Sequence, residues 1–108
     1  MLTVAFWLLL VAALGGLTMA VLDGATRPLR IGHGAIAGVG LLCLLIGAFI
    51  QPGLLVWSAF ALVAIGFGAG AVFFGVIFKH RAPPRFLIIG HGALNGLGVL
   101  LLGIQVFS

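Results

Sequence analysis

Two histidines occupy matching places in a segment that occurs twice in this chain of 108 residues. Residues 27–40 return as residues 85–98, and every position of the second copy keeps the same offset from its counterpart, without a gap. Each copy contains Gly-His-Gly, with His33 in the first and His91 in the second. A histidine within an apolar segment is uncommon and marks a candidate functional site. The repeat itself predicts two related halves.

Two neutral imidazoles at the same depth could bind one metal ion from opposite sides. Haem iron fits this arrangement best, because its axial ligands are often histidines, whereas zinc usually takes three or four protein ligands. We therefore expect His33 and His91 to be the metal ligands of a b-type haem. The arrangement is similar to the two-histidine b-haem sites of membrane cytochromes.

Small residues follow each histidine along the same helix face. By the i+4 and i+7 spacing, these positions are Ala37 and Gly40 after His33, and Asn95 and Gly98 after His91. Gly40, Asn95 and Gly98 are candidate haem contacts, since small residues leave space that either a flat ligand or another helix could fill. Asn95 can also form a hydrogen bond to His91 one turn away.

Four arginines are expected at the same membrane face as the histidines. Guanidinium groups pair well with carboxylates, so these side chains are candidate partners of the two haem propionates. They are Arg27, Arg30, Arg81 and Arg85.

A structural role for the histidines stays open beside the haem hypothesis. Duplication copies a histidine whether or not it binds anything, and an imidazole near a helix start can satisfy backbone groups or a nearby carbonyl. His80 has no counterpart in the first half, and we expect it at the lipid headgroups.

The composition indicates which elements must position these residues. With 64% hydrophobic and 6% charged residues, the chain lacks the polar surface of a water-soluble globule. Four apolar stretches are long enough to cross a hydrocarbon core of about 30 Å. They cover residues 2–22, 31–50, 54–78 and 86–107.

The predicted fold is all-α, a polytopic membrane four-helix bundle built from two parallel-repeat helical hairpins. These hairpins, residues 2–50 and 54–107, form a single transmembrane domain of residues 1–108. All five Lys and Arg residues lie in the connections 23–30 and 79–85. The positive-inside rule places both connections in the cytoplasm and both termini on the outer side, with a bacterial inner membrane as the expected location.

Eighteen glycines suggest close helix packing. Three pairs have the small-xxx-small spacing of membrane helix interfaces, Gly34 and Gly38, Gly66 and Gly70, and Gly92 and Gly96. Glycine on the outer faces predicts a homo-oligomer or a larger membrane complex.

Three classes of function remain. The first is a b-haem electron-transfer protein or subunit with a quinone as its redox partner. The second is a cofactor-free accessory or assembly subunit. The third is a small oligomeric transporter, which is less favoured because the spans offer few polar groups to line a pathway.

Asp23 is the only acidic residue, so carboxylate-pair and Ser-His-Asp catalysis are excluded and no catalytic residue is predicted. We expect no enzyme activity from the chain alone. The basic residues sit at helix ends, which argues against nucleic acid as a partner.

Overall fold

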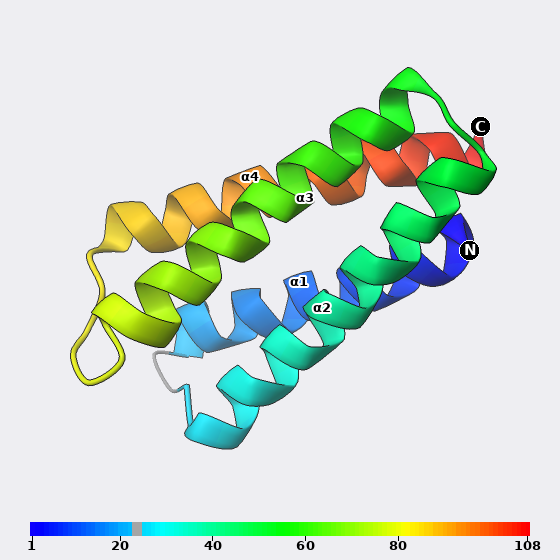
Figure 1. Cartoon of the computed structure of the whole chain (residues 1–108). Helices are drawn as coiled ribbons and strands as arrows, with labels where there is room; N and C mark the ends of the chain where they lie inside the picture. Colours follow the sequence, from blue (N-terminus) through cyan, green and yellow to red (C-terminus); the bar gives the residue numbers. More distant parts are fainter. Residues whose placement is uncertain (23–24) are drawn as a thin grey trace.

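The computed structural model describes residues 1–22 and 25–108 and has the predicted all-α, four-helix architecture (Figure 1). Four long helices and one π-helical turn follow one another along the chain. They are α1 (Leu2–Leu22), α2 (Arg27–Ile50), α3 (Leu54–Val72), η1 (Phe73–Ile77) and α4 (Arg85–Phe107). By length and composition, four segments can cross a membrane, the third being α3 together with η1.

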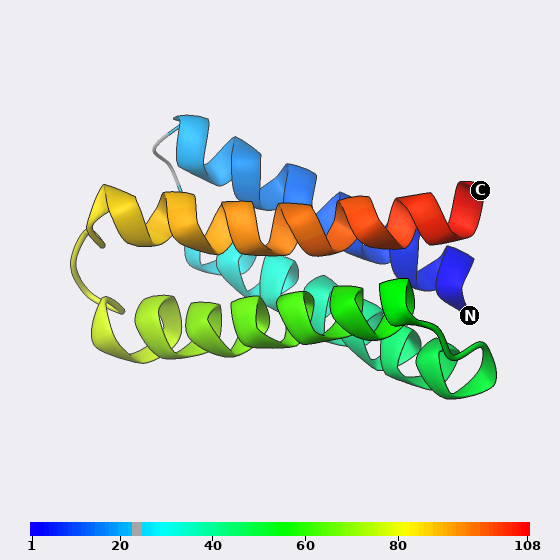
Figure 2. The ribbon, with the colours of Figure 1, turned by 90° about the horizontal axis from the view of Figure 1, so that it is seen from above.

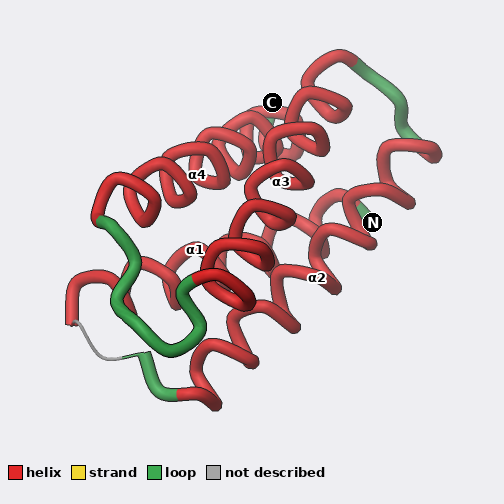
Figure 3. Tube along the Cα trace, turned by 60° about the vertical axis from the view of Figure 1, so that its left-hand side comes forward, coloured by secondary structure: helices red, strands yellow, loops and turns green. Residues whose placement is uncertain are grey.

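The helices form two antiparallel hairpins. Helix α1 packs along α2, and α3 packs along α4, while the hairpins meet through α1 with α4 and α2 with α3. Helices α2 and α4 therefore occupy one diagonal of the bundle. Both termini and the connection between α2 and α3 lie at one end (Figures 1 and 3). The start of α2 and the connection that precedes α4 lie at the other end (Figure 2). We call it the basic end, because it carries Arg27, Arg30, Lys79, Arg81 and Arg85.

The start of α2 differs from the prediction. Residues 23–30 were expected to form a connection, but the helix already begins at Arg27. Pro28 stands in its first turn, where the missing N–H is no loss and the fixed φ suits a helix. Arg27 and Arg30 therefore project from the first helical turn. Asp23 and Gly24 lie outside the described residues.

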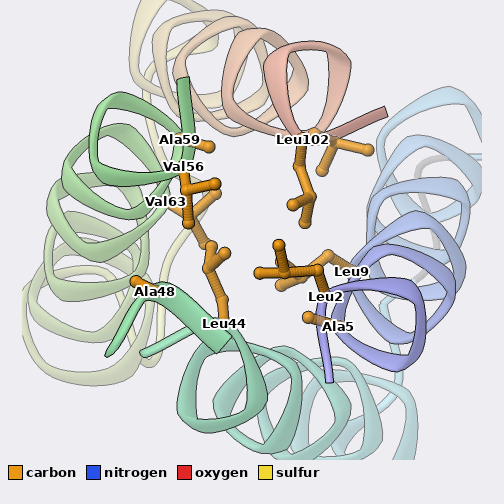
Figure 4. Close-up of a cluster of buried hydrophobic side chains, with 10 residues drawn as sticks. Leu2, Ala5, Leu9, Leu44, Ala48, Val56, Ala59, Val63 and Leu102 are labelled. Atoms are coloured by element: carbon orange, nitrogen blue, oxygen red, sulfur yellow. The ribbon is translucent and has the colours of Figure 1, made fainter. Parts of the chain in front are cut away.

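The buried core fills the half of the bundle that is remote from the basic end. Aliphatic side chains from all four helices point toward the bundle axis there (Figure 4). They are Leu2, Ala5, Leu9, Leu44, Ala48, Val56, Ala59, Val63, Val99 and Leu102. Many large apolar side chains are instead exposed on the outside, as expected of a surface that faces lipid acyl chains.

Glycines allow close helix approach in this core. A Cβ atom added at Gly40 would lie 2.9 Å from Cγ of Leu9, and one at Gly98 would lie 2.6 Å from a methyl group of Val63. Neighbouring helices thus fill the space beside Gly40 and Gly98, the second of the two alternatives considered from the sequence.

The glycine pairs with small-xxx-small spacing behave unequally. Gly66 and Gly70 lie against side chains of α4. Cβ atoms at Gly34, Gly92 and Gly96 would meet no atom within 4 Å in the described part of the chain. The prediction that the Gly92 and Gly96 pair packs helices together is therefore wrong within this chain, because α4 turns that face outward.

Candidate histidine site

Helices α2 and α4 bring the two repeated histidines together near the basic end. The ring centroids of His33 and His91 are 6.3 Å apart, with an angle of 69° between the ring planes. Because the two helices lie on one diagonal of the bundle, the rings approach from opposite sides. Each is half-buried and lies within two turns of the start of its helix.

Each imidazole is tied to the other helix of its own hairpin. His33 Nδ1 lies 2.8 Å from the carbonyl oxygen of Ala12, and His91 Nδ1 lies 3.0 Å from that of Gly66. A carbonyl oxygen only accepts hydrogen bonds, so Nδ1 is the donor in both rings. The neutral imidazoles therefore share one tautomer, which leaves the lone pair on Nε2.

A glycine lies beneath each ring, one turn after the residue whose carbonyl binds it. A Cβ atom at Gly16 would lie 3.0 Å from Cε1 of His33, and one at Gly70 would lie 2.5 Å from Cε1 of His91. The role of Gly16 was missed in the sequence. The sequence alone carries no signal for it, because Gly16 matches Gly70 only after the structure has identified Ala12 and Gly66 as the acceptors.

His91 has two further neighbours. Asn95 donates a hydrogen bond from Nδ2 to the backbone oxygen of His91 at 2.8 Å, and the same nitrogen lies 3.4 Å from His91 Nδ1. Since Nδ1 donates to Gly66, this second approach is a packing contact. Phe74, in η1, packs edge-on against the His91 ring with centroids 5.2 Å apart.

The other candidate residues lie farther from the imidazoles. All four arginines are exposed at the basic end, and Arg81 stacks over the ring of Phe78 at 5.2 Å. Gly40 and Gly98 stand two turns along from the histidines, packed in the core. Within the described residues, no group of three His, Cys, Asp or Glu side chains is placed to hold a metal ion. A metal site here would have two protein ligands.

Two open grooves follow the lines along which the hairpins meet. One, of about 460 Å³, lies between α1 and α4 and includes Phe6, Leu10 and Val99; the other, of about 500 Å³, lies between α2 and α3 and includes Val39 and Phe67. Both are lined by apolar side chains and glycine, and neither reaches a histidine. They suit acyl chains or apolar side chains and offer no side-chain hydrogen bond to a quinone.

Four long apolar helices in so short a chain define a small integral membrane protein in contact with the lipid bilayer. Compared with models of protein families, with curated proteins and with solved structures, the chain matches none of them.

Proposed function

We propose that this protein is a small membrane electron-transfer protein in which His33 and His91 are the axial ligands of one b-type haem. The separation of the two rings carries the proposal. A metal ion with bonds of about 2 Å to one nitrogen of each imidazole holds the ring centres about 6 Å apart. The observed 6.3 Å agrees with that value.

The hydrogen bonds at Nδ1 support the same assignment. A histidine that binds a metal commonly donates its other ring N–H to a carbonyl or carboxylate, which fixes the ring orientation and makes the ligand more basic. Both imidazoles have this arrangement, with Ala12 and Gly66 as the acceptors. Nε2 is the nitrogen that remains available to iron.

A porphyrin held between α2 and α4 extends toward α1 and α3, which occupy the other diagonal of the bundle. Gly16 of α1 and Gly70 of α3 lie against the imidazoles and place no side chain in its way. Phe74, which follows α3 in η1, packs against the His91 ring.

The proposal includes the membrane orientation. Five basic residues gather at the basic end, so this end faces the cytoplasm and the four arginines are available to the haem propionates. A quinone is a suitable electron donor or acceptor in the surrounding lipid, although the side chains that line the two grooves offer its polar ring no hydrogen bond.

We also propose that the hairpins are structural repeats. The support is that each hairpin joins its repeated histidine to a backbone carbonyl of its other helix, His33 to Ala12 and His91 to Gly66. The stretch from carbonyl to histidine is slightly longer in the second hairpin, positions 66 to 91 against positions 12 to 33. The additional length falls in the part that contains η1 and the connection to α4.

A cofactor-free accessory subunit is the second candidate. It is favoured by the outward-facing glycines, Gly34, Gly92 and Gly96, which leave a surface against which another helix can pack closely. In that case the bonds from the histidines to Ala12 and Gly66 only link helices. A transporter receives no such support, since the side chains that line both grooves are apolar.

The visible absorption spectrum of protein expressed with ample haem tests the proposal. We expect a Soret band and the sharp reduced-state bands of six-coordinate, low-spin haem. His33→Ala and His91→Ala should each abolish the low-spin spectrum, whereas His80→Ala is the matched control that should preserve it, because His80 lies in the connection before α4. A colourless wild-type protein would refute haem binding and favour the accessory role.

A further inference from the structure

The two imidazoles are held unequally. His91 is flanked by the Asn95 amide and the Phe74 ring in addition to its bond with Gly66. The position that matches Asn95 in the repeated segment is Ala37. The position that matches Phe74, by the offset that relates Ala12 to Gly66, is Ala20. Both have only a methyl side chain, so the first hairpin lacks both of these restraints.

These neighbours restrict the motion of one ring. To leave its position, His91 must turn about its side-chain bonds, past an amide anchored to its own backbone and an aromatic ring 5.2 Å away. The Cε1 atom of His91 also approaches its glycine more closely than that of His33 does, 2.5 Å against 3.0 Å for an added Cβ. For His33, the hydrogen bond to Ala12 is the one side-chain bond found among the described residues. His33 can therefore turn away at lower cost.

We propose that His91 is the permanent axial ligand and His33 an exchangeable one, an inference that rests on the proposed haem function. Reduced haem then binds a small neutral diatomic molecule in place of His33. In the exchange, the bond from iron to Nε2 of His33 breaks and its electron pair stays on the nitrogen. A bond from iron to the incoming molecule forms with that molecule's electron pair. No proton is transferred and the oxidation state of iron does not change.

Carbon monoxide added to the dithionite-reduced protein is the probe, read from the Soret shift and from the ratio of haem to protein. We expect carbon monoxide to bind to the wild type. His33→Ala should retain haem as a five-coordinate, high-spin form that binds carbon monoxide more tightly, and His91→Ala should lose most of its haem.

Ala37→Asn is the matched variant, because it gives His33 the amide that His91 already has. It should weaken carbon monoxide binding roughly twofold, the factor that corresponds to an i, i+4 side-chain contact of about 0.5 kcal/mol, because the amide packs beside the ring and does not bond it. When Asn95→Ala is combined with each histidine variant, the difference in haem content between His33→Ala and His91→Ala should become smaller, because His91 then lacks the amide beside its ring. Equal haem loss from His33→Ala and His91→Ala, or a haem-bound wild type that does not react with carbon monoxide, would overturn the inference and leave the proposed function standing. A colourless wild type would overturn both.

Discussion

The contact between Gly70 and His91 gives a prediction whose size can be worked from the structure. In Gly70→Ala, the new Cβ would lie 2.5 Å from Cε1 of the ring, closer than real Cβ contacts come. The ring cannot simply turn aside, since Asn95 and Phe74 flank it. It must move away from α3 and lengthen its bond to Gly66. Overpacking of this kind costs about 1–3 kcal/mol, and the weakened hydrogen bond adds about 1 kcal/mol.

Gly68→Ala is the control for this prediction. Gly68 lies in the same helix, and a Cβ there meets no atom within 4 Å. Both substitutions gain the same preference of alanine for helix, about 1 kcal/mol. The difference between the two variants therefore isolates the contact with the ring. The free energy of unfolding, measured by titration with a denaturing detergent and followed by circular dichroism, should be about 2–4 kcal/mol lower for Gly70→Ala than for Gly68→Ala.

The first hairpin extends the series. Gly16→Ala should be destabilising by a smaller amount, since its Cβ would lie 3.0 Å from a ring with fewer restraints, and Gly15→Ala should resemble Gly68→Ala. Equal stabilities of Gly70→Ala and Gly68→Ala would refute the reasoning, because they would mean that the ring does not rest on α3 as described.

Three further predictions concern packing, orientation and the π-helical turn. Gly98→Leu should destabilise the bundle by at least about 1–3 kcal/mol, because its Cβ already meets Val63 at 2.6 Å. Gly96→Leu should not lower the free energy of unfolding, because a Cβ there meets no atom within 4 Å and leucine prefers the helix to glycine. Equal effects of the two substitutions would contradict the assigned rotation of α4. After Ser108, a reporter that works only on the outer side of the membrane should be active, and within residues 79–84 one that works only in the cytoplasm should be active. The reverse pattern would contradict the proposed orientation. Phe74→Ala should bind carbon monoxide more tightly than the wild type, with an affinity closer to that of His33→Ala, as read from the Soret shift, because His91 is then less restrained. An affinity equal to that of the wild type would mean that Phe74 does not restrain His91.

Local properties of the sequence were enough to predict the four spans. Length and unbroken apolar character alone require a helix in lipid, and α1 has the predicted bounds of 2–22. The repeated segment predicted which two histidines correspond, and the short connections predicted antiparallel neighbours. Each of these properties can be read without knowing how any helix is turned about its own axis.

The rotation of each helix about its axis was decided by tertiary packing. Gly96 and Gly98 are only two residues apart in the chain, yet Gly96 faces outward and Gly98 packs against Val63. The sequence offers glycine at both places and does not say which meets a neighbour. The same rotation selects Ala12 and Gly66 as hydrogen-bond acceptors and brings Gly16 beneath a ring. A backbone carbonyl has no residue type to signal it, so only the packed bundle reveals that both imidazoles donate from Nδ1 and keep Nε2 free.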